Sequence, residues 1–311
     1  MQRTKATRPS EKDGSMTDEP QLPTLMDVRE KLQLIDHSRL AEAASTPDRA
    51  GNPAQRAATY PARLALAAMA CADSTLGSAR RAGATHAKVL DLACGSAMIS
   101  RIVLAAGAAS VTAADANPAM IEAAESCGPA AGLRLDCIDA TQQLPYPDSS
   151  FDMVWIGNFW QPDMLPEVRR VLRPGGRLVL RWTTALDWIP AADPIFAERV
   201  AAAVETGMAR WSSQGADGGD TWPSGALPGL TLTDSWADSV EFRAPLPEAV
   251  QEYVLQDFAC FHGAFARAAL DDGDWAKLCN LMDPASPEFA LTSEHARVAW
   301  TFEYRVHVPV A

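Results

Sequence analysis

The run Val-Leu-Asp-Leu-Ala-Cys-Gly-Ser-Ala at positions 89–97 constrains this chain most, because it joins an apolar segment to a turn of small residues. The apolar residues predict a strand over Lys88–Leu92, buried on both faces as in a parallel sheet. Small residues let a ligand approach the backbone closely, and a helix is expected to begin near Met98. Ligands of open α/β sheets bind beyond such carboxyl ends. The run therefore predicts a nucleoside-cofactor turn, although an ordinary strand–turn–helix unit has the same local pattern.

A second strand ends on an acidic residue at a distance that suits nucleotide binding. Residues 110–114 read Ser-Val-Thr-Ala-Ala and precede Asp115, which stands 20 positions after Gly95. A carboxylate at the tip of the neighbouring strand can accept hydrogen bonds from ribose hydroxyls. The nicotinamide fingerprint needs a glycine three positions after its second glycine, where this chain has Met98. The spacing therefore supports a ribose site and disfavours a dinucleotide.

Strands and helices alternate further along the chain. Asn117-Pro118 caps and starts a helix, and Phe151–Ile156 reads as a strand. A later helix is stopped by Pro174-Gly175-Gly176, and a strand over Leu178–Trp182 follows. This rhythm predicts an α/β fold with a mostly parallel sheet and helices on both faces.

Four segments together carry a family resemblance, and they cover roughly residues 85–182. They are Val89–Gly95, Asp115–Ile121, Asp139–Ala140 with Leu144–Val154, and Glu167–Leu178. In order and spacing they resemble the motifs of class I S-adenosylmethionine (SAM)-dependent methyltransferases, in the group that includes ubiquinone- and menaquinone-biosynthesis enzymes. The resemblance implies a Rossmann-like sheet, mostly parallel with an antiparallel C-terminal edge, and helical cap and lid segments.

The resemblance also implies which residues hold SAM. Asp91 would orient the amino group, Asp115 the ribose hydroxyls, and Asp139 the adenine amino group. Met120 would pack on the base, although a methionine on an apolar helix face is equally typical of a core. The implied cofactor residues are Asp91, Ala93, Gly95, Asp115, Ala116, Met120, Asp139, Ala140, Ile156 and Gly157.

Two positions depart from the family pattern, since Ala93 and Ala97 stand where glycine is common. Alanine at position 93 is a frequent variant. The methyl group of Ala97 is expected near the ligand. Ala97 and the unusual loop at Trp160 motivate an alternative reading, in which a methyltransferase-fold protein uses SAM structurally or not at all and catalyses another reaction or acts as a binding module.

The acceptor pocket is expected to be partly apolar or aromatic. Its candidate residues are Tyr60, Arg63, Trp160, Trp182, Phe258 and Phe261. Tyr60 and Arg63 lie one helical turn apart, within reach of the SAM carboxylate or the acceptor, or in plain packing roles. Phe258, Phe261 and His262 would lie near one helix face, with Asp257 also in range. His262 is the candidate general base, because histidine exchanges protons near neutral pH, and a packing or capping role is the competing interpretation.

The net charge of the chain limits the classes of partner that it is expected to bind. A net charge of −12 over 311 residues repels polyanions, so a small-molecule substrate is expected and a nucleic acid is not. No apolar run has the length of a membrane helix, and Met1–Glu19 lacks a secretory apolar core, so a cytoplasmic location is expected. The cysteines are scattered without metal-ligand spacing, so no metal site is expected.

The remaining chain divides around the cofactor unit. We expect a disordered tail over 1–23, an N-terminal helical cap over 24–84 and the SAM-binding domain over 85–311. That domain would contain a connection at 183–235 and a helical lid at 246–293, between strands Ser239–Arg243 and Val298–Val308. The connection contains Trp188, Trp211 and Trp222, which could line a homodimer contact as easily as a substrate channel.

These observations predict SAM-dependent methylation of a small, partly apolar or aromatic molecule, with S-adenosylhomocysteine (SAH) as the product of SAM. O-methylation is favoured over C- or N-methylation because a histidine base suits a hydroxyl acceptor.

Overall fold

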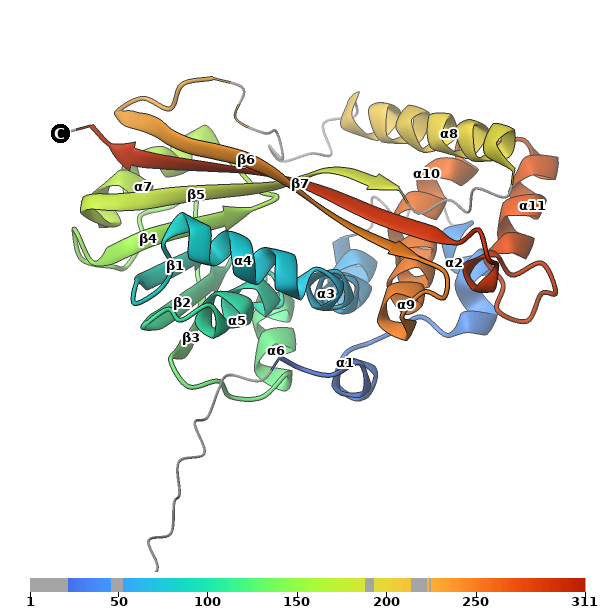
Figure 1. Cartoon of the computed structure of the whole chain (residues 1–311), viewed down its shortest axis with the longest axis horizontal. Coiled ribbons are helices and arrows are strands. Elements are labelled where there is room, and N and C mark those ends of the chain that lie inside the picture. Colours follow the sequence, from blue (N-terminus) through green and yellow to red (C-terminus); the bar gives the residue numbers. More distant parts are fainter. Residues whose placement is uncertain (1–21, 46–52, 188–192, 214–222, 224, 311) are drawn as a thin grey trace, which may run out of the picture.

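The computed structural model describes residues 22–45, 53–187, 193–213, 223 and 225–310. Within these residues, seven strands form one sheet in the order β3-β2-β1-β4-β5-β7-β6 (Figure 1). The strands are β1 (Lys88–Leu92), β2 (Ser110–Asp115), β3 (Leu133–Cys137), β4 (Phe151–Gly157), β5 (Leu172–Asp187), β6 (Leu230–Arg243) and β7 (Arg297–Pro309).

Strand directions confirm the predicted sheet. Strands β3, β2, β1, β4 and β5 pair in parallel, and β7 pairs antiparallel with both β5 and β6. Leu92 of β1 lies opposite Ala114 of β2 and Ile156 of β4, so three carboxyl ends are aligned. The chain moves outward from β1 to β3 on one side and from β4 to β5 on the other. The crevice at the carboxyl ends of β1 and β4 is therefore the switch point, the place where open α/β sheets bind ligands.

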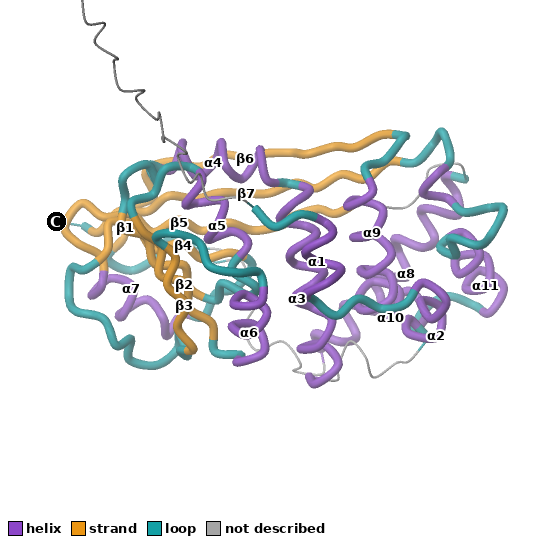
Figure 2. Tube along the Cα trace, turned by 90° about the horizontal axis from the view of Figure 1, so that it is seen from below, coloured by secondary structure: helices purple, strands orange, loops and turns teal. Residues whose placement is uncertain are grey.

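Helices cover both faces of the sheet (Figure 2). The N-terminal helices are α1 (Leu25–Lys31), α2 (Leu40–Ala44), α3 (Pro53–Ala70) and α4 (Ala72–Ala82); α5 (Met98–Ala105), α6 (Pro118–Ser126) and α7 (Leu165–Val171) follow strands β1, β2 and β4. Alternate strand residues separate the two faces: Val89 and Met153 pack in one cluster with α3, α4 and α5, whereas Leu90 and Val154 pack in another with α7. This is the period-2 burial that a sheet covered on both faces requires.

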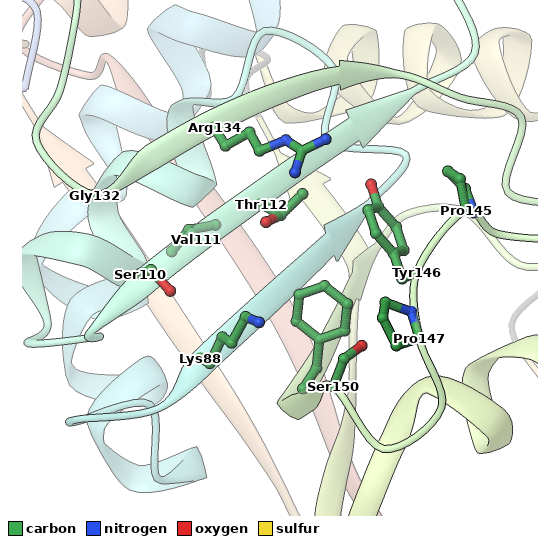
Figure 3. Close-up of a pocket in the computed structure, with 11 residues that line it drawn as sticks. Lys88, Ser110, Val111, Thr112, Gly132, Arg134, Pro145, Tyr146, Pro147 and Ser150 are labelled. Atoms are coloured by element: carbon green, nitrogen blue, oxygen red, sulfur yellow. The ribbon is translucent and has the colours of Figure 1, made fainter.

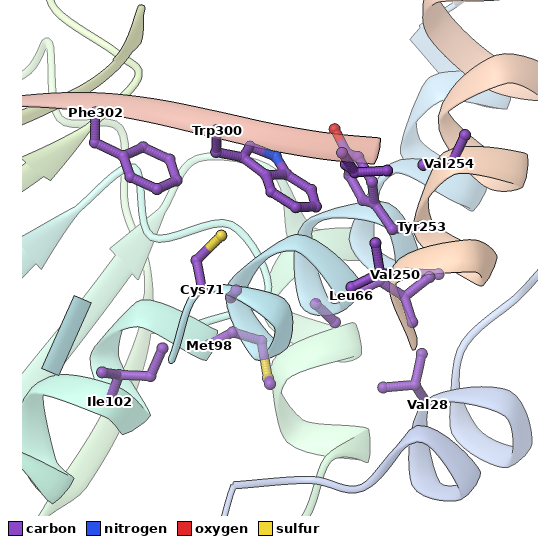
Figure 4. Packing of buried hydrophobic residues seen from close by; sticks show 14 of the residues in the cluster. Val28, Leu66, Cys71, Met98, Ile102, Val250, Tyr253, Val254, Trp300 and Phe302 are labelled. Atoms are coloured by element: carbon purple, nitrogen blue, oxygen red, sulfur yellow. The ribbon is translucent and has the colours of Figure 1, made fainter. Parts of the chain in front are cut away.

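A second helical group lies beyond the carboxyl end of the sheet. It comprises α8 (Pro194–Ser213), α9 (Glu248–Asp257), the π-helical turn Phe258–His262, α10 (Gly263–Arg267) and α11 (Asp272–Leu281). The long strands β5, β6 and β7 reach this group in Figure 1, and Figure 4 shows Tyr253 of α9 beside Trp300 of β7. The centroids of those two rings are 5.1 Å apart. Apolar packing therefore joins these helices to the antiparallel edge.

Two strands are longer than the sequence predicted. Strand β6 begins at Leu230 instead of Ser239, and β5 continues to Asp187 beyond Trp182. The expected connection 183–235 therefore contains the end of β5, helix α8 and the first half of β6. The residues of β6 from Thr231 onward are exposed or half-buried because β6 is an edge strand, so no apolar run marks it. Trp188 and Trp222 lie outside the described residues.

In the part of the chain that the structure describes, no helix is long and apolar enough to span a membrane.

Candidate cofactor and active site

The turn between β1 and α5 is compact and lies under helix α3. Ala93, Gly95 and Ala97 have φ angles of 55°, 55° and 54°, in the left-handed region that favours glycine. The Ala97 N–H donates to the Cys94 carbonyl at 3.0 Å and closes the turn. A Cβ on Gly95 would lie 2.8 Å from Cδ1 of Leu64 in α3. Backbone conformation and close packing therefore both favour glycine at position 95.

The extra methyl group at Ala97 is accommodated without blocking the turn. Ala97 is fully buried in a small cluster with Ala113 of β2 and Ala124 of α6. Its methyl group thus packs between the sheet and α6. The expectation that this methyl group lies near the ligand stays a prediction.

Asp115 stands at the tip of β2, facing this turn. Its Oδ2 accepts from the Gly95 N–H and its Oδ1 from the Asn117 N–H, both at 2.9 Å. Burial raises the pKa of Asp115, although both backbone bonds favour its charged form. Each carboxylate oxygen can accept a further hydrogen bond, so the side chain can still receive two ribose hydroxyls.

Asp91 is a buried carboxyl group on β1, 2% exposed. Its Oδ2 accepts from the Ser100 hydroxyl of α5 at 2.5 Å. Burial raises the pKa of Asp91 to about 7, and the Ser100 hydrogen bond opposes this rise. A ligand ammonium group beside Asp91 would favour its charged form, and SAM carries such a group.

The other predicted cofactor residues lie along the same edge. Asp139 is exposed and accepts from the N–H and hydroxyl of Thr141 at 2.9 and 2.7 Å, and the hydroxyl contributes most to lowering the pKa of Asp139. Ala116 and Met120 follow β2, Ala140 follows Asp139, and Ile156 and Gly157 end β4. The residues present thus fit a nucleoside with an amino-acid group, and their contacts with it stay predictions.

Side chains from α3 and the π-helical turn meet on a buried aspartate. Asp257, the last residue of α9, is fully buried. Its Oδ1 accepts from Nη1 of Arg63 at 2.5 Å and from the Tyr253 hydroxyl at 3.3 Å, and its Oδ2 bonds Nδ1 of His262. Burial alone would raise the pKa of Asp257, but His262 and then Arg63 bring it below its usual value. Arg63 is therefore committed to an ion pair within the protein.

Asp257 also orients the candidate base. A carboxylate bonded to Nδ1 fixes the imidazole ring and turns Nε2 to the opposite side, as second-sphere carboxylates do for functional histidines. From the sequence, Asp257 was expected near His262, but no bond between the two was predicted. Asp257 and His262 are five residues apart, and the π-helical turn places them on the same side of the helix. Such turns are frequent at functional sites.

The same π-helical turn separates two predicted pocket residues. Phe258 is 1% exposed and stacks on Trp275 at 5.8 Å, inside the helical group. Phe261 instead lies against His262 and Arg63, with centroid distances of 4.9 and 4.6 Å. Phe258 and Phe261 were expected near one face on an α-helical spacing, and the wider π-helical winding explains the difference.

The remaining pocket candidates belong to two regions. The Tyr60 ring lies 4.6 Å from the Arg63 guanidinium. Trp160 is 3% exposed and belongs to the cluster on the α7 face, against which the half-buried Trp182 packs. Trp160 therefore has little surface available for a ligand in this conformation.

A pocket of about 350 Å³ opens at the opposite, amino-terminal end of the strands (Figure 3). Lys88, Thr112 and Arg134 line it from β1, β2 and β3, and Tyr146 and Phe151 close another side. Its cations already have partners, since Arg134 pairs with Asp136 at 2.9 Å and the Lys88 ammonium lies 5.2 Å from the Phe151 ring centroid. The described residues contain no group of three or more His, Cys, Asp or Glu side chains that could hold a metal ion.

Known proteins match this chain over about a third of its length, in the part that contains β1 to β4. Residues 89–176 match the family model described as a methyltransferase domain. An uncharacterised methyltransferase of Mycobacterium tuberculosis is 32% identical over 109 residues, 33% of this chain and 43% of that protein. The demethylmenaquinone methyltransferase of Thermus thermophilus is 38% identical over 100 residues, 30% of this chain and 46% of that protein. This chain therefore matches less than half of the length of either relative.

Among solved structures, the YcgJ protein of Bacillus subtilis aligns with a TM-score of 0.43 at 16% identity, over 77% of this chain and 99% of that one.

Proposed function

We propose, from the match of residues 89–176 to the family model of a methyltransferase domain, that the protein transfers a methyl group from SAM to a small molecule. The observation that carries the proposal is the bond between the Gly95 N–H and Asp115, which joins the β1 turn to the tip of β2 at 2.9 Å. SAM supplies a methyl group already activated on a sulfonium sulfur. Asp115 would hold the ribose of SAM, and Asp91 would hold its amino group. The backbone of the turn after β1 would lie against the cofactor.

The acceptor in this proposal is partly apolar or aromatic and presents a hydroxyl group. Methyl transfer is an in-line attack, so the protein positions the acceptor and removes its proton. His262, oriented by Asp257, would take that proton at Nε2. The rings of Phe261 and Tyr60, both beside Arg63, support an acceptor with an apolar portion.

Calorimetric titration with SAM and SAH tests the cofactor half of the proposal. Wild type and Asp234→Ala, which removes a largely exposed carboxylate from the edge strand β6 at the far side of the sheet, should bind both ligands. Asp115→Ala should lose about tenfold or more in affinity, because the ribose loses its charged acceptor. A folded wild-type protein that binds neither ligand would overturn the proposal and favour a methyltransferase fold with another use.

A methyl-transfer assay over paired phenols and anilines tests the acceptor half. Phenols should be the better substrates, and His262→Gln should lower kcat by about 10²- to 10⁴-fold, the usual contribution of a general base. An unchanged kcat in His262→Gln, or turnover of anilines alone, would contradict O-methylation through His262.

The charge of −12 supports a small acceptor over a nucleic acid. We expect no binding to duplex DNA at low salt, and binding there would redirect the proposal to nucleic-acid methylation. Light scattering of the purified protein decides between a monomer and a homodimer, and cell fractionation tests the proposed cytoplasmic location.

A further inference from the structure

Arg181 of β5 is a buried cation at the carboxyl end of the sheet. It is 6% exposed, its Nε donates to the Tyr304 hydroxyl at 3.3 Å, and its guanidinium stacks on the Phe302 ring at 4.0 Å. No carboxylate of the described residues lies within the 4.0 Å of an ion pair with Arg181. A buried guanidinium without a carboxylate in contact is costly, so this position suits an arginine that receives an anionic ligand.

An unsatisfied donor lies beside Arg181. Trp155 of β4 is fully buried, and its Nε1 has no hydrogen-bond acceptor among the described residues. Gly157 pairs in register with Arg181. A Cβ added to Gly157 would have a single neighbour within 4 Å among the described atoms, Nε1 of Trp155 at 4.0 Å. The indole N–H is thus a buried donor without an acceptor among the described residues, next to the open position above Gly157 at the switch-point edge.

A carboxylate lies on the same face of the sheet, two strands away from Arg181. Asp91 pairs in register with Trp155, so Asp91, Trp155 and Arg181 occupy one sheet face on the neighbouring strands β1, β4 and β5. Neighbouring strands are about 4.8 Å apart, which places the backbones of β1 and β5 about 10 Å apart. An amino-acid head group fits between a carboxylate and a guanidinium at this spacing, with its ammonium toward Asp91 and its carboxylate toward Arg181.

We propose that Arg181, with the indole N–H of Trp155, binds the carboxylate of the amino-acid moiety of SAM and SAH, opposite Asp91. The inference rests on the proposed function, since it assigns a subsite of the same ligand. It replaces Arg63 in that role, because Arg63 already pairs with Asp257. The subsite makes the protein selective for nucleosides that carry a complete amino-acid group.

The test compares two ligands by calorimetry: SAH and the SAH analogue that lacks only the carboxylate. Wild type should bind SAH about tenfold or more tightly than the analogue. Arg181→Gln should weaken SAH by about 10- to 100-fold and leave the affinity for the analogue within about twofold. Arg181→Lys should recover part of the SAH affinity, and Trp155→Phe should show a smaller loss of the same selectivity.

Arg177→Gln is the matched control, because Arg177 lies on the same strand but is exposed and donates to the Ala82 carbonyl at 3.2 Å. It should keep the wild-type preference for SAH. Equal wild-type affinity for the two ligands would overturn the subsite while leaving SAM binding established. An equal loss of both ligands in Arg181→Gln would also overturn it, since that pattern indicates a structural role.

Binding of neither ligand by folded wild type would overturn both the subsite and the proposed function. If Arg181→Gln does not fold, the wild-type preference and its reduction in Trp155→Phe decide the question.

Discussion

The backbone N–H of Gly95 donates to the carboxylate of Asp115 at 2.9 Å, across 20 residues of sequence. The bond ties the left-handed turn after β1 to the tip of β2, and the N–H of Asn117 holds the second carboxylate oxygen. Both strand ends are thereby held in position before a ligand arrives, and such preorganisation lowers the entropic cost of binding.

Gly95→Ala should destabilise the protein by about 1–2 kcal/mol, because an alanine at φ 55° is strained and its Cβ would meet Leu64. Gly77→Ala is the control, since Gly77 lies inside helix α4 with nothing within 4 Å of an added Cβ. That change should stabilise by about 0.5–1 kcal/mol. Urea unfolding followed by circular dichroism measures both, and the same sign for the two variants would count against this account.

Ala97→Gly should leave the affinity for SAH within about twofold, because the Ala97 methyl group packs on Ala113 and Ala124. Calorimetry with SAH provides the measurement. A large gain in affinity in Ala97→Gly would show that the methyl group does obstruct the cofactor site.

Asp257→Asn should destabilise the protein by about 3–5 kcal/mol, because it leaves the buried Arg63 guanidinium without its counter-charge. The matched change Asp234→Asn breaks the exposed pair between Arg81 and Asp234, whose side chains are 50% and 44% exposed, and should cost at most about 1 kcal/mol. Comparable shifts of the urea midpoint in the two variants would contradict the burial argument.

Stability should decrease between about pH 4 and pH 7 through Asp91. The pKa of this group is about 7 in the folded protein against 3.8 as its usual value, so the folded state keeps a proton that the unfolded chain releases. This contribution is present in full below the unfolded pKa and is lost as the pH rises through the folded pKa, with a magnitude of roughly a few kcal/mol.

Asp91→Asn cannot titrate and should show a flatter dependence of the urea midpoint between pH 4 and pH 8. Parallel profiles for wild type and Asp91→Asn would mean that Asp91 is already ionised at the lower pH.

Local features of the cofactor edge could be predicted from the sequence. The glycine at position 95, the acidic residue 20 positions later and the alternation of strands and helices each depend on neighbouring residues, because left-handed turns, caps and buried strands have their own residue preferences. The parallel order of the strands then follows from the short crossovers between them.

The contacts among the candidate acceptor residues could not be predicted without the tertiary structure. Arg63 and Asp257 are 194 residues apart, and their contact exists because α3 packs on α9 and a π-helical turn brings His262 onto Asp257. The first half of strand β6 was not predicted, because an edge strand has no apolar run. Helix α8 lies within the segment that the sequence analysis treated as a connection.

The sequence by itself determined the turn after β1 and the alternation of strands and helices, since these rest on preferences of residues near in the chain. Only the tertiary structure decided which charges are paired. Arg63 is neutralised by Asp257, whereas Arg181 has no carboxylate within ion-pair distance among the described residues and shares a sheet face with Asp91. The difference arises from packing between distant elements, which decides whether a buried arginine meets a carboxylate of its own chain.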